Sequence, residues 1–192
     1  MAVRLLSFAG SSRKDSLNKK LARFAAKEAE ALDASATFID LKDYEMPLYN
    51  GDLEQEKGVP EKARDLKKLI RQYDAVFISS PEYNSGVTPL LKNTVDWLSR
   101  KHGDEKDPID IFKTKVWGLG AVSGGSLGGI RGLAPLRQTF IGLLALIVSE
   151  QTAVKFGNDA FAEDGSLKDE ATAKLLKAQL KRMIDLAEKL KA

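Results

Sequence analysis

Short, nearly uninterrupted apolar runs recur along the chain and alternate with longer stretches of helical periodicity. Two examples are residues 75–78 (AVFI) and 143–148 (LLALIV). A strand that is apolar at successive positions is typical of a parallel sheet whose two faces are both covered by helices. The alternation therefore predicts an α/β fold in which helices connect parallel strands.

The sequence predicts a single domain over residues 1–192, built from five strand–helix units. The predicted strands cover residues 3–9, 35–40, 74–79, 115–122 and 145–154, and the predicted helices cover 16–32, 60–72, 88–101, 127–142 and 168–190. Apolar residues at helical spacing in the first and last helices are interpreted as core: Leu17, Leu21, Phe24 and Ala25, then Leu176, Leu180, Met183, Ile184 and Ala187. Together these units predict a three-layer sandwich.

The composition, 43% hydrophobic and 30% charged residues, is typical of a globular protein. No apolar run approaches the roughly 20 residues that span a bilayer. The segment after Met1 lacks the basic, apolar and cleavage regions of a signal peptide. We therefore expect a cytoplasmic protein that does not associate with membranes.

The chain has no cysteine, which excludes disulfides, thiolate metal sites, iron–sulfur clusters and thiol catalysis. Its single histidine, His102, lies in the polar run KHGDEKDP, so neither a histidine-dependent triad nor a metal site is expected. The net charge of +3, with dispersed lysines, does not indicate nucleic-acid binding. Any redox chemistry must therefore use a borrowed cofactor.

Two long polar connections, residues 42–59 and 101–114, are of the length at which loops are usually functional or mobile. The first holds an unusual apolar and aromatic cluster: Tyr44, Met46, Pro47, Leu48, Tyr49 and Asn50. Three roles are open for this cluster. It walls a site, meets a partner subunit, or simply packs over the sheet edge.

Residues 10–18 (GSSRKDSLN) follow the first predicted strand and open a helix. Ser11, Ser16 and Asn18 offer hydroxyl and amide donors, and Arg13 offers a planar fork of donors to phosphate oxygens. The helix start adds the positive end of its dipole. These features predict an anion site, although GxxxxGK and GxGxxG are both absent. In the alternative interpretation Ser16 is a plain helix cap and Arg13 a solvated charge.

Residues 81–93 (PEYNSGVTPLLKN) follow the third predicted strand directly. In doubly wound sheets, ligands bind beyond the carboxyl ends of the strands, where loop residues serve binding more than packing. Residues 81–86 fit that role. The alternative is an ordinary strand-to-helix turn in which Pro, Asn and Gly supply only the turn geometry.

Residues 122–138 (VSGGSLGGIRGLAPLRQ) follow the fourth predicted strand, and their glycines allow the backbone to approach a flat ligand closely. With these three segments, the chain resembles the flavodoxin-like NAD(P)H-dependent FMN reductases, which include quinone, chromate and azo-dye reductases. The likeness covers nearly the whole chain, and the middle segment is its most specific part. It implies a five-stranded parallel sheet of order 2-1-3-4-5 with helices on both faces.

In proteins of this kind the first loop holds the FMN phosphate, the second wraps the isoalloxazine and ribityl chain, and the third approaches the pyrimidine side of the ring. The resemblance therefore implies these FMN-binding residues: Ser11, Arg13, Ser16, Asn18, Pro81, Glu82, Tyr83, Asn84, Gly86, Ser123, Gly124 and Gly125. The chain departs from the family in having Ser12 where a larger apolar residue is frequent, and Thr88-Pro89 where many members have Pro-Gly. Neither change removes an expected ligand.

The resemblance implies an enzyme that carries a hydride from NADPH or NADH through FMN to a quinone, a dye or a metal oxyanion. Flavin chemistry needs no catalytic acid, base or nucleophile from the protein. We hypothesise a ping-pong cycle in which backbone amides of residues 82–86 and 123–125 stabilise negative charge on the reduced ring. Glu82 is interpreted as structural, because a single loop carboxylate more often accepts backbone hydrogen bonds. Tyr83 either stacks on the ring or lines the acceptor pocket.

Other functions remain open from the sequence. One is a flavin reductase that releases FMN as a product, a second is a flavodoxin-like electron carrier, and a third is a non-catalytic anion- or nucleotide-binding module. The positive net charge and the SSRKDSLN loop disfavour the carrier. Family members are commonly dimers or tetramers, so we expect a homodimer or homotetramer. Trp97 and Leu98 are candidates for a helix-packed interface, with ordinary core as the alternative for Trp97.

Overall fold

A five-stranded parallel sheet forms the centre of the computed structural model, which describes residues 2–191. Its strands are β1 (Arg4–Ala9), β2 (Ser35–Ile39), β3 (Ala75–Ser79), β6 (Val116–Val122) and β7 (Leu146–Val154). They run in the order β2-β1-β3-β6-β7, and every neighbouring pair is parallel. The predicted flavodoxin-like order 2-1-3-4-5 is therefore confirmed.

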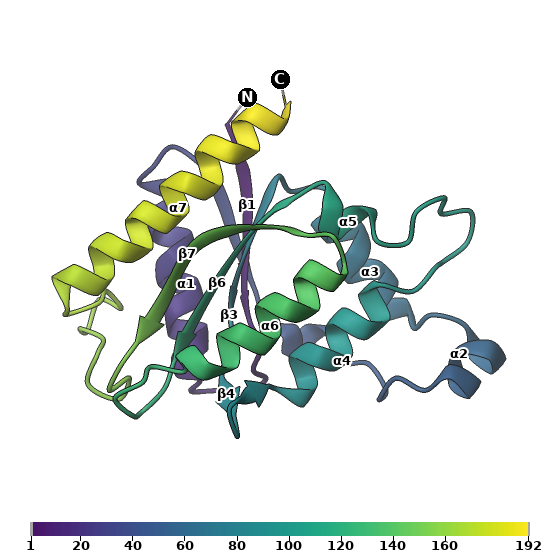
Figure 1. The fold of residues 1–192 in the computed structure, drawn as a ribbon, viewed down its shortest axis with the longest axis horizontal. Helices are drawn as coiled ribbons and strands as arrows, with labels where there is room; N and C mark the ends of the chain where they lie inside the picture. Colours follow the sequence, from purple (N-terminus) through teal and green to yellow (C-terminus); the bar gives the residue numbers. More distant parts are fainter. Residues whose placement is uncertain (1, 192) are drawn as a thin grey trace.

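Five longer helices cover the two faces of the sheet (Figure 1). One face carries α1 (Leu17–Glu30) and α7 (Glu170–Lys191), and the other carries α3 (Glu61–Ile70), α4 (Pro89–Leu98) and α6 (Ile130–Gly142). All five occupy the stretches in which the sequence predicts helices. None of the helices within residues 2–191 has the length and apolar character needed to cross a bilayer.

Side chains alternate along each strand between two separate cores. In β3, Phe77 packs with α1 and α7, whereas Val76 and Ile78 pack with α3, α4 and α6. The β3 residues are all buried, because helices exclude water from both faces. On the second face, Trp117 and Phe140 have ring centroids 4.9 Å apart and help join β6 to α6.

Three short helical segments and one hairpin lie where no regular structure was expected. They are the 3₁₀ turn η1 (Leu41–Tyr44), α2 (Gly51–Lys57), α5 (Asp110–Lys113) and a hairpin of β4 (Glu82–Tyr83) and β5 (Gly86–Val87). Such elements are too short for hydrophobic periodicity to mark them. The hairpin forms because Asn84 and Ser85 both adopt positive φ, at 52° and 63°, which is the geometry of a two-residue type I′ turn.

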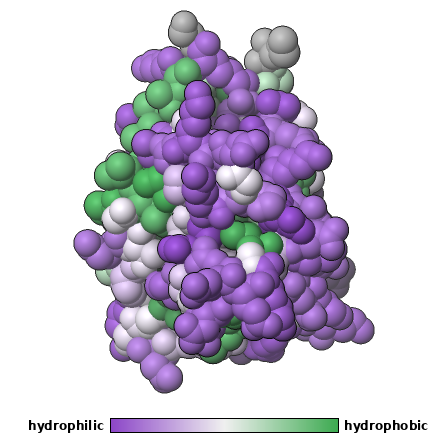
Figure 2. All heavy atoms as spheres, turned by 90° about the vertical axis from the view of Figure 1, so that its right-hand side faces the viewer, coloured by the Kyte–Doolittle hydropathy of each residue, from purple (hydrophilic) through white to green (hydrophobic). Residues whose placement is uncertain are grey.

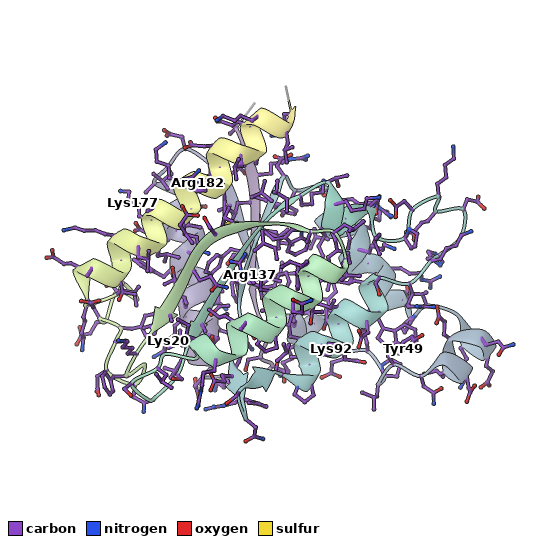
Figure 3. The ribbon with its side chains drawn as sticks, viewed as in Figure 1. Lys20, Tyr49, Lys92, Arg137, Lys177 and Arg182 are labelled. Atoms are coloured by element: carbon purple, nitrogen blue, oxygen red, sulfur yellow. The ribbon has the colours of Figure 1, made fainter. Side chains whose placement is uncertain are left out.

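The apolar cluster of the first long connection packs mainly onto α4. Tyr49, labelled in Figure 3, contacts Trp97 edge-on at 5.0 Å, and the Trp97 indole N–H donates to the Pro47 carbonyl at 2.8 Å. Trp97 and Leu98 are fully buried inside this chain, so the core interpretation holds and neither side chain is available to a partner subunit. The side of the molecule that includes α2 is mainly hydrophilic (Figure 2), although Leu48 stays exposed.

The second long connection is anchored to α3 by ion pairs. The Lys67 ammonium, itself buried, donates to Glu105 at 2.7 Å and to the Arg100 carbonyl at 2.9 Å. Arg71 adds pairs to Glu105 and Asp110. Burial raises the pKa of the Glu105 carboxyl, but the hydrogen bonds from Lys67 and Arg71 outweigh burial and hold that pKa below its ordinary value.

These contacts predict an acid-sensitive anchor. A carboxyl whose folded pKa is lowered stabilises the fold above its unfolded pKa, and that stability is lost as the pH falls through the folded pKa. Because Glu105→Gln leaves the Lys67 charge buried without its partner, we expect the free energy of unfolding to fall by about 3 kcal/mol at neutral pH. Urea titrations should show this deficit narrowing below about pH 4. Asp104→Asn, an exposed neighbour, is the control; an equal loss in both variants would contradict the anchor.

Candidate functional site

Three loops meet at the carboxyl edge of the sheet, the edge marked by β4 in Figure 1. They are residues 10–16 after β1, residues 80–88 after β3 and residues 123–129 after β6. The strands β1, β3 and β6 are adjacent and parallel, so their carboxyl ends lie side by side. The structure thus brings together all three segments that the sequence predicts to bind ligand.

The first loop offers unpaired positive charge and buried hydroxyl groups at the start of α1. Ser11 and Ser16 are buried, and Ser16 caps the helix by accepting from the Lys19 amide at 3.4 Å. The first turn of α1 carries no acidic residue. Arg13 is exposed, and no carboxylate within residues 2–191 lies at ion-pair distance from it. This combination fits a phosphate group, which both the helix dipole and the arginine favour.

Asn18 lies beneath this loop, and its side chain is already engaged. Its Oδ1 accepts from the Val122 amide at 2.9 Å and from the Ser79 hydroxyl at 2.8 Å, while its Nδ2 donates to the Val122 carbonyl at 3.0 Å. The residue is buried. These three bonds join the start of α1 to the ends of β3 and β6, and they use one of the two Nδ2 N–H groups with which Asn18 could bind a phosphate.

The first and second loops are held together by Thr88. Its hydroxyl caps α4 by accepting from the Leu91 amide and donates to the Gly10 carbonyl at 2.8 Å. The loops also approach closely, because a Cβ on Gly10 would lie 3.0 Å from the Leu91 Cβ. The Thr88-Pro89 sequence, a departure from the family pattern, is an ordinary helix start with Pro in the first turn.

The second loop is tied to the third by Glu82. Its Oε2 accepts from the Gly132 amide at 3.0 Å, and its Oε1 accepts from the Arg131 Nε at 3.0 Å. The carboxylate therefore fixes the hairpin on the start of α6, which confirms the structural interpretation of Glu82. Tyr83, next along the hairpin, is half exposed. The turn between β4 and β5 places Asn84 at the surface.

The third loop presents open backbone on one side and tight packing on the other. A Cβ on Gly125 would meet no atom within 4 Å, and one on Gly124 would come no closer than 3.6 Å. Gly128, in contrast, has φ 63° and a Cβ there would lie 2.9 Å from the Ala153 carbonyl carbon. Ser123 accepts from the Gly157 amide at 2.9 Å. The exposed glycine backbone fits the close approach of a flat ring.

Several residues that hold the site were not among the sequence predictions. These residues form hydrogen bonds that hold the three loops in place: Gly10, Thr88, Arg131, Gly132, Phe156 and Gly157. Only Thr88 carries a local signal, the cap-and-proline pattern. The others depend on contacts between distant segments.

Two hollows of about 380 Å³ flank this edge. One lies beside the first loop, with Lys14, Arg23 and Asp40 in its lining, and the other lies behind the third loop, with Phe156 and Asp169. Neither lining includes a residue of the β4–β5 hairpin. The hollow beside the first loop includes Ser16 in its lining and so adjoins the proposed phosphate site, whereas the hollow lined by Phe156 contains none of the candidate FMN ligands.

Comparison with known proteins identifies the family. Residues 3–159 match the NADPH-dependent FMN reductases, which is most of the chain. This chain belongs to that family. Membership makes it an oxidoreductase that works with FMN and NAD(P)H, and it agrees with the phosphate-binding features of the first loop and the exposed glycines of the third.

Similar proteins extend over nearly the whole length of this FMN reductase family member. It is 31% identical to a quinone reductase of Escherichia coli strain K12, covering 98% of this chain and 97% of that protein. It is 33% identical to a 2-hydroxy-1,4-benzoquinone reductase of a Burkholderia species, covering 92% and 91%. The solved structure of the Paracoccus denitrificans flavoenzyme FerB, an NAD(P)H:(acceptor) oxidoreductase, superposes with a TM-score of 0.81 at 32% identity and covers 98% of each chain.

The two kinds of glycine in the third loop predict opposite phenotypes. Gly128→Ala forces a methyl group against backbone at positive φ, so we expect the free energy of unfolding to fall by at least about 2 kcal/mol in denaturant titrations. Gly125→Ala has free space and is expected to leave the stability of the flavin-free protein unchanged, while weakening FMN binding in a fluorescence titration. Full FMN affinity in Gly125→Ala would remove Gly125 from the binding surface.

Proposed function

We propose that this enzyme transfers a hydride from NAD(P)H to FMN and then two electrons from the flavin to a quinone, in a ping-pong cycle at one site. One observation carries the proposal: Arg13, just before α1, and the open backbone of Gly124 and Gly125 lie at the same edge of the sheet. The reductases named above for quinone substrates support the acceptor class, because they match this chain over more than nine-tenths of its length.

The first loop binds the phosphate end of FMN in this proposal. Arg13 supplies a guanidinium whose two-pronged geometry matches phosphate oxygens, and Ser11 and Ser16 supply hydroxyl donors. Ser16 is suited to both tasks, because its oxygen accepts from Lys19 while its proton remains free to donate. Asn18, a phosphate-ligand candidate from the sequence, is left out of this set because its side chain is bonded to Val122 and Ser79.

The second and third loops hold the ring. Pro81, Glu82, Tyr83, Asn84 and Gly86 present backbone along one side, and the carboxylate of Glu82 keeps that side fixed to α6. Ser123, Gly124 and Gly125 present backbone at the opposite side, where their amides stabilise negative charge on the ring edge in the manner of an oxyanion site.

The bound flavin supplies the hydride-accepting and electron-donating chemistry, so the protein positions the reactants and excludes side reactions. No side chain is assigned as an acid, a base or a nucleophile. In this proposal Tyr83, which is half exposed, contacts the acceptor, because an aromatic side chain favours a flat partner.

A second candidate is a flavin reductase that binds FMN as a substrate and releases it reduced. The family description, NADPH-dependent FMN reductase, favours this second function, because it names FMN as the molecule that is reduced. An electron carrier is less well supported. Flavodoxins share a strongly acidic surface, whereas this chain has a net charge of +3.

The absorbance spectrum of the purified, desalted protein separates these functions. We expect flavin bands that bleach on anaerobic addition of NADPH and return with benzoquinone, and steady-state rates whose double-reciprocal plots are parallel. A colourless protein that oxidises NADPH only with added FMN would establish the flavin reductase instead. Bound flavin that neither NADPH nor NADH bleaches would point to a carrier and overturn the proposal.

Arg13 gives the sharpest test of the phosphate site. Arg13→Ala removes a charge-assisted contact worth about 1.5–3 kcal/mol, so FMN should bind roughly 10- to 100-fold more weakly while riboflavin affinity is unchanged. Lys14→Ala, which removes the adjacent exposed cation, is the matched control and should change FMN affinity by less than about threefold. Equal losses in both variants would mean that Arg13 acts only through general charge.

A further inference from the structure

We infer that Asn18 is a positioning residue that sets the phosphate end of the flavin site against its ring end, and that it does not bind the phosphate. The inference deepens the proposed function and rests on it. The buried side-chain amide of Asn18 is already hydrogen-bonded within the protein. Both lone pairs of Oδ1 and one N–H of Nδ2 are used by groups of the protein.

The contacts of Asn18 join segments that are far apart in sequence. Its pair of bonds to Val122 reproduces the way a neighbouring strand would bond, and it extends the pairing of β6 onto the start of α1, 104 residues away. The bond from Ser79, 61 residues away, adds the last residue of β3. One side chain of α1, the helix that follows the first loop, therefore contacts the strand ends from which the second and third loops begin.

The position of Asn18 makes its effect specific to ring geometry. Val122 is the last residue of β6 and directly precedes Ser123, whose amide belongs to the proposed ring-edge group. Asn18 is 4% exposed, so water cannot replace a lost bond easily. Loss of the Asn18 bonds should therefore shift the Ser123 backbone, while the exposed guanidinium of Arg13, which takes no part in these bonds, keeps its reach to phosphate.

Chemistry at the site limits what can replace Asn18. Aspartate has the same shape, but it would face the Val122 carbonyl with an oxygen in place of a donor. Leucine would leave the Val122 amide and the Ser79 hydroxyl without these partners, which burial penalises. Ser79→Ala, in contrast, removes only one of the three bonds and keeps the pairing with Val122.

The test compares Asn18→Asp, Ser79→Ala and Arg13→Ala in the full chain, with FMN affinity, riboflavin affinity and the reduction potential of bound FMN as readouts. For a positioning role, Asn18→Asp should weaken riboflavin binding as well as FMN binding, and FMN should lose more because the new carboxylate repels its phosphate. The ratio of its affinities for reduced and oxidised flavin should also fall about tenfold. For a two-electron couple, this makes the reduction potential of bound FMN about 30 mV more negative. Ser79→Ala should shift the potential in the same direction by less, and Arg13→Ala should not shift it.

A phosphate-ligand role gives a different pattern. Asn18→Asp would then bind FMN as weakly as riboflavin, with wild-type riboflavin affinity and an unchanged potential, and the inference would be overturned. If Asn18→Asp does not fold, Ser79→Ala carries the test, together with hydrogen exchange of the Val122 amide in the flavin-free protein. That amide should exchange faster in Ser79→Ala; unchanged exchange and unchanged potential would also overturn the inference. A wild-type protein that binds no flavin would refute the proposed function itself.

Discussion

Burial of both faces of the parallel sheet is the constraint on which the rest of the structure depends. Successive strands are connected through helices that pack on one face or the other, and these crossovers let every strand run in the same direction. The polar loops that bind ligands can then gather only beyond the strand ends. The same apolar packing that stabilises the fold therefore gathers the proposed flavin-binding loops at one edge.

Packing brings the loops to that edge, but hydrogen bonds from buried or half-buried side chains set their spacing. Thr88 joins the first loop to the second, Glu82 joins the second to the third, and Asn18 joins the first to the third. Each of these bonds pairs a side chain with distant backbone, so each also satisfies a group that burial would otherwise penalise. Such cross-links suit a site whose protein contribution is alignment.

Packing and polar contacts also hold the two long connections, residues 42–59 and 101–114, against the helices. Their lengths suggested function or mobility, yet Tyr49 packs on Trp97 and Glu105 pairs with the buried Lys67. Aromatic contact and desolvated charge hold these connections against α4 and α3. Loop length alone therefore says little about freedom of movement when the loop carries groups that bury well.

The sequence by itself determined the sheet, its helices and the three ligand loops, because apolar runs, helical periodicity and segments such as PEYNSG are local properties of the chain. The tertiary structure decided which polar residues remain available to a ligand. The sequence makes Asn18 a candidate phosphate ligand and the Glu82 carboxylate a structural group, but the residues that they bond, Val122 and Gly132, lie 104 and 50 residues away. Hydrogen bonds over such separations form only when the strands are paired, so no local pattern could have revealed them.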